Sequence, residues 1–311
     1  MTNKTGFTKE YYLKRIGLSN GKYYEWKKRM GIENKHNSNL PKSNWVTPME
    51  QSVIIEYATK HYAHNSYYVK DGYRRLTYRM IDEDIVAVSP SSVYRILKTA
   101  GLLNRWNTKK QKGKGTGFTQ PTKPHQHWHI DIKYVNFNGT FLFLISVLDG
   151  YSRYVLHHGL RLSMTEFDVE LVIEQTKEKF PGYHPRIISD NGPQFISKDF
   201  HLYMKIVEFE HVRTSVNYPQ SNGKIERFHG SINRECLNTN SFVDYEHAQN
   251  TIAKYIDYYN KERLHSALFY LTPEDFLVER VAEKLKVRQN KLNKATDDRI
   301  RYWQNQNRKA A

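Results

Sequence analysis

A basic segment that cannot form a core divides this sequence into two parts of different periodicity. Residues 107–124, NTKKQKGKGTGFTQPTKP, are rich in Lys, Gly, Thr and Pro and are typical of a linker. Apolar residues recur at helical spacing before this segment, whereas strand-like alternation begins after it. A chain of 311 residues has room for about two domains. We therefore predict an all-α region followed by a mixed α/β domain.

Charge is distributed unevenly over the predicted segments. These segments are a helix-turn-helix region at 1–112, a basic linker at 113–124, an α/β domain at 125–280 and a basic helical tail at 281–311. Lys and Arg outnumber Asp and Glu by 23 to 9 up to residue 124 and by 9 to 3 in the tail, but the α/β domain has 16 basic and 20 acidic residues. Basic ends suit DNA phosphates, and an acidic middle suits metal cations.

Cysteine and hydropathy patterns exclude several protein classes. A single cysteine, Cys236, rules out internal disulfides and a multi-cysteine zinc site within one chain. The longest strongly apolar run, Phe141–Leu148, is far shorter than the ~18 residues that cross a bilayer. The first residues lack the apolar stretch of a secretion signal. We expect a soluble cytoplasmic protein with no membrane partner.

Residues 8–30 have the outline of a helix-turn-helix. A break at Ile16-Gly17-Leu18 separates two short helical patterns, and Ser19 is placed to cap the second. The second helix combines cations with aromatic rings, which suits phosphate contacts, although an ordinary amphipathic hairpin is the alternative. The DNA-contacting residues predicted in this unit are Lys22, Tyr23 and Lys27.

A second such unit is predicted over about 48–103. It contains a helix over 48–62, a basic helix around Tyr73–Met80 and a third helix delimited by Ser89 as cap, Pro90 at the first position and Gly101 after the end. The DNA-contacting residues predicted here are Arg74, Arg75, Ser92, Arg95 and Lys98.

The α/β domain opens with a hairpin. The strands His127–Phe137 and Thr140–Leu148 flank Asn138-Gly139, a two-residue turn sequence. Ser163 and Glu166 have capping-box spacing, which predicts a helix from there to about Phe180. The remaining predicted elements are strands at 153–160, 186–189 and 209–214 and helices from about 197, 222 and 243.

Three carboxylates lie where predicted strands or helices meet loops. Asp131 is on the first strand, Asp190 ends the fourth, and Glu226 begins a helix 35 residues further on. Phosphodiester chemistry uses two hard cations, roughly 3.5–4 Å apart, that activate the attacking oxygen and stabilise the leaving oxygen. We predict that these carboxylates hold two Mg²⁺ or Mn²⁺ ions.

Basic residues accompany Glu226 on its predicted helix. Lys224, Arg227 and Arg234 are expected to contact DNA near the cut. The predicted buried side of the helix consists of Ile225, Phe228, Ile232 and Cys236. The alternative is a solvated helix face with ordinary surface salt bridges.

These motifs resemble a known family. HWHIDIKYV, SDNGPQF, NYPQSNGKIERFHGSINRE and YNKERLHSALFYLTPEDF are similar to successive core motifs of OrfB-type insertion-sequence transposases, which have a retroviral-integrase-like core. IGLSNGKYYEWKKR, GYRRLTYRM and VSPSSVYRILKTAGLL resemble the helix-turn-helix segments of that family. The resemblance covers most of the chain and includes the D–D–35–E spacing.

The resemblance implies both a fold and a function. It implies an RNase H-like catalytic domain, a mixed five-stranded sheet with helices, in which Asp131, Asp190 and Glu226 are the metal ligands. It implies a nucleoid-associated transposase that acts as a homo-oligomer on double-stranded DNA, with or without a partner protein from a neighbouring reading frame. Two positions depart from many relatives: Lys133 replaces a small hydroxyl residue, and Asn233 replaces a lysine, for which Arg234 is the nearest substitute.

Three other functions remain open from the sequence. His127, His129 and Asp131 alternate on one strand face and would suit a transition-metal hydrolase. A DNA-binding regulator that has lost its chemistry is a second alternative, although all three carboxylates are present. A nuclease of the same fold that cuts DNA without joining it is the third.

Overall fold

The computed structural model describes residues 7–31, 45–63, 71–103, 120–214 and 222–310. The chain divides into two compact units, Met1–Lys42 with Ile300–Ala311 and Ser43–Arg299. Most of the predicted linker lies outside the described residues, so the predicted domain boundaries stay predictions. No helix in the described ranges has both the length and the apolar composition that crossing a bilayer requires.

Residues 8–30 form the two short helices that the first helix-turn-helix outline predicts. α1 spans Lys9–Arg15 and α2 spans Asn20–Lys28. The Ser19 hydroxyl accepts the N–H of Lys22 at 3.3 Å, which confirms the predicted N-cap. Gly17 has φ of +68°, a left-handed conformation that glycine adopts without steric cost, so the tight break follows from its sequence.

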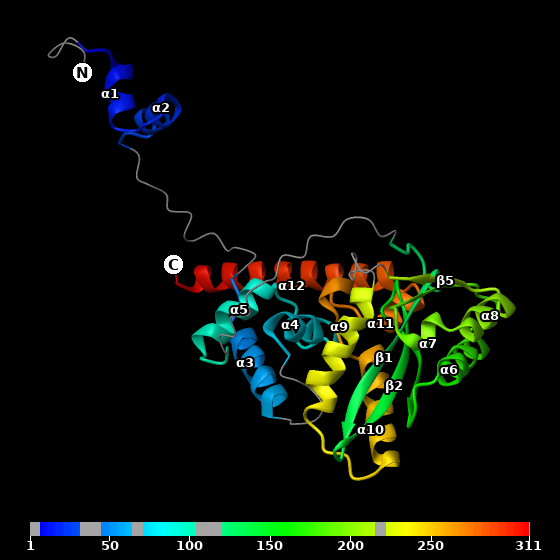
Figure 1. The fold of residues 1–311 in the computed structure, drawn as a ribbon. Coiled ribbons are helices and arrows are strands. Elements are labelled where there is room, and N and C mark those ends of the chain that lie inside the picture. Colours follow the sequence, from blue (N-terminus) through cyan, green and yellow to red (C-terminus); the bar gives the residue numbers. More distant parts are fainter. Residues whose placement is uncertain (1–6, 32–44, 64–70, 104–119, 215–221, 311) are drawn as a thin grey trace. The chain divides into compact units, whose positions relative to one another are not determined.

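Three helices form the second predicted helical group: α3 (Pro48–Ala63), α4 (Tyr73–Asp82) and α5 (Pro90–Thr99) (Figure 1). Ser89 caps α5, and Pro90 takes its first position, as predicted. One apolar cluster holds the three helices together, and its fully buried members include Ile54, Leu76, Val93 and Leu97.

The α/β domain is built on a five-stranded mixed sheet, which confirms the predicted fold class. The strands are β1 (His127–Phe137), β2 (Thr140–Asp149), β3 (Val155–Arg161), β4 (Arg186–Ser189) and β5 (Glu210–Arg213), in the order β3-β2-β1-β4-β5. β1, β2 and β3 pair antiparallel, whereas β4 runs parallel to β1 and to β5. Asn138 and Gly139 have φ of +49° and +83°, as a type I′ hairpin turn requires.

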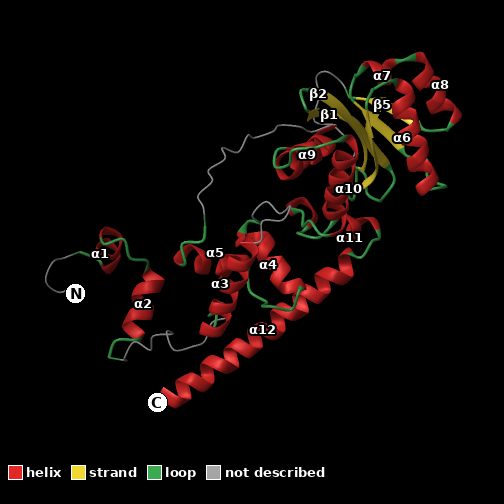
Figure 2. Ribbon diagram, turned by 90° about the horizontal axis from the view of Figure 1, so that it is seen from below, coloured by secondary structure: helices red, strands yellow, loops and turns green. Residues whose placement is uncertain are grey.

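Helices cover both faces of this sheet (Figure 2). One face packs against α6 (Glu166–Lys179) and α8 (Lys198–Ile206), with the short α7 (Pro193–Ile196) beside them. The other face packs against α9 (Gly223–Ile232) and α10 (Tyr245–Lys261). Successive strand residues point to opposite faces, so each position on β1 belongs to one layer or the other. The buried residues of α9 include Ile225, Phe228 and Ile232, as predicted.

Three predicted details of this domain are wrong. The capping box of α6 uses Thr165 and Asp168, rather than Ser163 and Glu166, because the Thr165 hydroxyl accepts the N–H of Asp168 and the Asp168 carboxylate accepts the N–H of Thr165. β3 begins at Val155 instead of at Arg153, which has φ of +65° and lies in the preceding turn. The long helix predicted from 222 changes to a π-helical turn, η3, at Asn233–Leu237.

The C-terminal part of the chain returns to the helical group formed by α3, α4 and α5. The 3₁₀ turn η4 (Ser266–Leu268) and α11 (Pro273–Leu277) precede α12, a single helix over Val281–Ala310. Arg288 on α12 makes an ion pair with Asp82 of α4 at 2.6 Å, and Arg299 pairs with Glu50 of α3 at 2.9 Å. The part of α12 up to Arg299 is therefore joined to the helical group by charge.

A buried ion pair joins η3 to the end of α10. Arg263 donates to both oxygens of Glu235, at 2.6 and 2.7 Å, and the Tyr255 hydroxyl donates to the same carboxylate at 3.0 Å. Each charged side chain is only 6% exposed. Removing one partner of such a pair leaves an uncompensated charge in the interior.

We predict that Glu235→Ala lowers the free energy of unfolding by about 3–5 kcal/mol, because Arg263 then stays buried without a counter-ion. The control is Asp257→Ala, which removes the exposed pair of Asp257 and Lys261 and costs less than about 1 kcal/mol. Urea denaturation measures both variants. Equal losses in the two variants would contradict this role for the buried pair.

Candidate active site

Asp131 and Asp190 come from two neighbouring parallel segments of the sheet, β1 and the residue that follows β4. His129 of β1 is in register with Ile188 of β4, and Asp131 and Asp190 each follow two residues later, Asp131 within β1 and Asp190 directly after the end of β4. Adjacent strands are about 4.8 Å apart. Val135, an even number of residues from Asp131 on β1, packs in the core under α9 and α10. The Asp131 side chain therefore faces the α9 layer.

Backbone amides restrain both aspartates. Asp131 Oδ1 accepts the N–H of Ile132 at 2.8 Å, and Asp190 Oδ1 accepts the N–H of Gly192 at 2.9 Å. The second oxygen of Asp131 lies 3.4 Å from Nδ1 of His229. Asp190 is exposed, whereas Asp131 is half-buried. These contacts limit the rotation of each carboxylate.

The beginning of α9 is tied to the sheet. Asn222 precedes the helix, and its Oδ1 lies 3.3 Å from Nδ1 of the buried His129 ring on β1. Lys224 in the first turn donates to the carbonyl oxygen of Gly150 at 2.7 Å. Together with the histidine contact to Asp131, these bonds hold the backbone of Glu226 beside β1.

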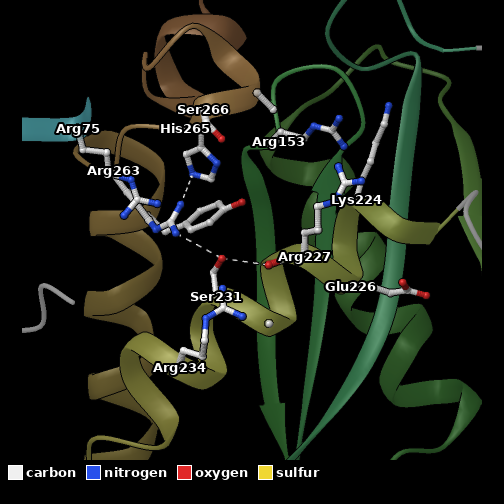
Figure 3. Close-up of a pocket in the computed structure, with 13 residues that line it drawn as sticks. Arg75, Arg153, Lys224, Glu226, Arg227, Ser231, Arg234, Arg263, His265 and Ser266 are labelled. Carbon is white, nitrogen blue, oxygen red and sulfur yellow. Dashed lines mark hydrogen bonds between the residues drawn. The ribbon is translucent and has the colours of Figure 1, made fainter. Parts of the chain in front are cut away.

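The three carboxylates do not converge in this structure. The Glu226 side chain is exposed and points away from Arg234 and Arg263 in Figure 3. In the described part of the chain, no three His, Cys, Asp or Glu side chains are close enough to hold a metal ion. Like charges repel at short range, so convergence of three carboxylates requires cations.

The donor set fits a hard divalent cation. Asp131, Asp190 and Glu226 offer oxygen atoms, which Mg²⁺ and Mn²⁺ prefer. Nε2 of His229 is buried and has no hydrogen-bond partner among the described residues, so the polar interior beside Asp131 is incompletely satisfied. His129, the central residue of the alternative His-x-His-x-Asp motif, is fully buried. Burial lowers the pKa of His129 to about 3, so its ring is neutral at pH 7.

A cavity of about 480 Å³ lies beside Glu226, and six of the 13 residues that line it are Lys or Arg (Figure 3). Lys224, Arg227 and Arg234 come from α9 and η3, so all three cations predicted near the cut reach it. The other lining residues are Arg75, Arg153, Glu226, Gly230, Ser231, Tyr259, Arg263, His265, Ser266 and Ala267.

Burial and crowding of like charges perturb two of these cations. Burial, followed by the charge of Arg153, lowers the pKa of Lys224 to about 7. Burial also lowers the pKa of Arg153 to about 10. A cation whose pKa is lowered in this way is stabilised by an incoming anion, so the cavity favours negatively charged ligands.

The remaining predicted DNA-contacting residues lie on the helices of the N-terminal half. Lys22 and Lys27 of α2 are exposed, and Tyr23 is half-buried. Arg74 on α4 and both Arg95 and Lys98 on α5 are exposed. Ser92 is buried, and its hydroxyl accepts a hydrogen bond from Arg95 at 3.3 Å, so it supports Arg95 rather than offering an exposed hydroxyl.

The two departures from the family pattern have different surroundings. Asn233 is half-buried at the start of η3, and the neighbouring Arg234 is exposed and lines the cavity. The Arg234 guanidinium lies 3.3 Å from the position that a Cβ on Gly230 would take, so a glycine there leaves room for it. Lys133 is half-buried on β1.

The cavity residues that sequence reasoning missed include Arg153, Arg263 and His265. Arg263 and His265 stand in the YNKERLHS motif, which gave only a family likeness. Arg153 was assigned to a strand. The available signal was the sequence Asp149-Gly150-Tyr151-Ser152-Arg153, which combines turn residues with a cation between two apolar strands.

Comparison with known proteins identifies the α/β domain. Two family models described as "Integrase core domain" match residues 121–219 and 207–273. The chain is 29% identical over 214 residues to the "Insertion element IS407 uncharacterized 31.7 kDa protein" of Burkholderia multivorans, which covers 66% of this chain and 74% of that protein. It is 28% identical over 227 residues to "Transposase InsD for insertion element IS2A/D/F/H/I/K" of Escherichia coli, covering 69% of this chain and 75% of that one.

A solved structure resembles half of the chain. The HTLV-2 integrase catalytic core domain in complex with magnesium aligns with a TM-score of 0.41 and 20% identity, covering 50% of this chain and 98% of that one.

Gly192 provides a test of how Asp190 is positioned. A Cβ at this residue would lie 3.1 Å from Asp190 Oδ1 and 3.0 Å from Gln194 Oε1, so Gly192→Ala should displace the carboxylate. We predict a roughly 10–100-fold loss of Mn²⁺ affinity, measured by calorimetry. In the matched control Gly223→Ala, the added Cβ meets no described atom within 4 Å, and the affinity should stay unchanged. Unchanged affinity in Gly192→Ala would remove Asp190 from the ligand set.

Proposed function

We propose that this chain, which belongs to the insertion-sequence transposases with an integrase-like catalytic core, binds the ends of its mobile element, cleaves DNA strands there and joins the 3′-OH ends to target DNA. The chain is a polynucleotidyl transferase. The proposal adds the residues that carry the reaction and the DNA that they act on.

The observation that carries the proposal is the register of β1 and β4 beside the anchored start of α9. Asp131 and Asp190 each lie two residues beyond the registered pair His129 and Ile188 of β1 and β4, and Glu226 is held next to β1 by the contacts of its neighbours. Three acidic residues from distant parts of the sequence thus share one end of the sheet. Structural ion pairs do not account for this group, because none of the three is paired with a Lys or Arg in the described residues.

These carboxylates would hold two Mg²⁺ or Mn²⁺ ions per active site, which supply activation of the attacking oxygen and stabilisation of the leaving oxygen. The protein contributes positioning. Amides of Ile132 and Gly192 orient Asp131 and Asp190, and His229 lies against the second oxygen of Asp131. Lys224 and Arg227 extend from the same helix turn as Glu226, where they would hold the DNA strand by its phosphates.

DNA-end binding is assigned to the basic helices of the N-terminal half. The exposed cations of α2 and α5 lie on the last helix of each predicted helix-turn-helix unit, and the last helix of such a motif is the one that enters the major groove. We further propose that the protein works as a homo-oligomer on double-stranded DNA in association with the nucleoid, since two element ends must be joined to one target. A partner protein from a neighbouring reading frame stays a prediction.

The carboxylate assignment predicts that Asp131→Asn, Asp190→Asn and Glu226→Gln each abolish cleavage and strand transfer but leave binding to terminal DNA largely intact. The reason is that metal positioning supplies the rate, whereas basic residues supply the affinity. Oligonucleotide cleavage and joining assays with Mg²⁺ measure this, with the exposed Glu178→Gln as control. Full joining activity in any one variant would refute its assignment. Wild-type cleavage without joining would instead indicate a nuclease.

The assignment of end binding to α5 predicts a change in salt dependence. In the full chain, Arg95→Gln and Lys98→Gln should each weaken binding to terminal DNA and flatten the slope of log K against log salt by about one unit. The matched control is Lys198→Gln, which removes an exposed cation from α8. If the α5 variants and the control have the wild-type slope, α5 does not contact phosphates. Fluorescence anisotropy between low and moderate salt measures the slopes.

A further inference from the structure

The cationic cavity beside Glu226 contains more positive charge than the protein itself balances. Six of its lining residues are Lys or Arg. Two of them are neutralised internally, because Arg75 pairs with Asp71 at 3.1 Å and Arg263 pairs with Glu235 at 2.6 Å. The other four, Arg153, Lys224, Arg227 and Arg234, have no carboxylate within 4.0 Å in the described part of the chain.

We propose that this cavity binds one backbone phosphate of the DNA strand that passes the carboxylates, and that Arg153 is the residue that contacts this phosphate. The inference rests on the proposed function, since it takes the ligand to be the DNA substrate. It adds a binding residue on the turn between β2 and β3, away from the helix that carries Glu226.

Arg153 has an unsatisfied hydrogen-bond donor. Its Nη1 atom is buried and has no hydrogen-bond partner among the described residues. An unsatisfied donor on a buried charged group is destabilising, so a purely structural arginine would be expected to have an acceptor from the protein. A phosphate oxygen would satisfy this donor, because guanidinium groups bind phosphates through paired N–H bonds.

Hydrogen bonds to Asp149 hold the turn that carries Arg153. The buried Asp149 carboxylate accepts the N–H groups of His125, Tyr151 and Ser152 at 2.8, 3.2 and 2.7 Å, as well as the Ser152 hydroxyl at 2.6 Å. The Asp149 carbonyl also accepts the N–H of Arg153 at 3.0 Å. Because all of these bonds go to Asp149, this one residue restrains the backbone of the turn, and with it the position of Arg153.

Arg153 is strained in this turn, and Gly150 is a position where no larger residue fits. Arg153 has φ of +65°, which is unfavourable for a long side chain and persists only where the surrounding structure enforces it. Gly150 leaves no space for a Cβ, which would lie 3.0 Å from His129 Nε2 and 3.1 Å from the His127 carbonyl oxygen. Such strain is typical of binding sites, where it directs a side chain to a ligand.

The dimensions and neighbours of the cavity fit a phosphodiester. Its volume, about 480 Å³, is in the range of pockets that hold a nucleotide-sized group. Glu226 is the one carboxylate among the described lining residues, so the bound phosphate would lie next to the proposed reaction site. Arg227 and Arg234 line the same cavity and can share the charge of this phosphate or of its neighbour.

The test pairs variants of Arg153 with neutral phosphates in the DNA. Terminal DNA duplexes carry a single methylphosphonate, moved along each strand in turn, and their affinity for the full-length protein is measured in Ca²⁺ buffer, where we expect binding without turnover. Wild-type protein should lose roughly 10-fold in affinity at one position near the cleavage site. Arg153→Asn should weaken binding of unmodified DNA to a similar extent and should lose nothing further at that position.

Two variants control for folding and for general charge. Asn tolerates positive φ, so Arg153→Asn keeps the turn, and its melting temperature should match that of the wild type. Lys205→Gln removes one exposed cation from α8, and the methylphosphonate profile should keep the wild-type loss at that position. Arg153→Lys, which keeps the charge without the guanidinium fork, should restore part of the sensitivity.

The inference is overturned if every methylphosphonate weakens binding of Arg153→Asn as much as it weakens binding of the wild type. In that case the proposed function stands as long as Asp131→Asn abolishes cleavage that the wild type performs. A wild-type protein that binds terminal DNA and never cleaves it would instead overturn the proposed function.

Discussion

The attachment of α9 to the sheet is the constraint on which the candidate site depends. The Asn222–His129 and Lys224–Gly150 hydrogen bonds fix the first turn of the helix against β1 and the following hairpin. Because Glu226 lies in that turn, the same bonds set its distance from Asp131. The buried pair of Glu235 and Arg263 holds the other end of this helical segment. The helix is thus restrained on both sides of the residue that would complete the metal site.

The site combines opposite charges on adjacent surfaces. One aspartate lies within β1 and another directly follows β4, whereas four cations without a carboxylate partner among the described residues line the cavity beside Glu226. Cations in the cavity would attract a phosphate backbone, and the carboxylates would attract metal ions to the same place. Like charges repel, so both the group of carboxylates and the group of cations are stabilised when ions of opposite charge bind to them. DNA and metal ions would therefore bind cooperatively here.

Much of this arrangement could be predicted from sequence. The hairpin at Asn138-Gly139 and the caps at Ser19 and Ser89 depend on local chemistry that short motifs encode. The buried side of α9 follows from helical periodicity. The three carboxylates could be assigned from their spacing and motif likeness, and their role as metal ligands stays a prediction.

Other features depend on contacts between distant residues, which periodicity does not encode. The turn at Arg153 has a left-handed residue that is enforced by Asp149, so a strand pattern was extended too far. The cavity joins Arg75 of α4 to Arg263 after α10, and no local pattern relates these positions. The change to a π-helical turn at Asn233 coincides with the buried Glu235 pair, a long-range contact.

The most direct test of the central claim is a count of bound metal ions. Electron paramagnetic resonance of the full-length protein with terminal DNA and Mn²⁺ should detect two spin-coupled ions per active site, roughly 3.5–4 Å apart. Asp131→Asn should abolish the coupling. A single uncoupled ion in the wild type, or coupling that persists in Asp131→Asn, would contradict the assignment of these carboxylates as a two-metal site.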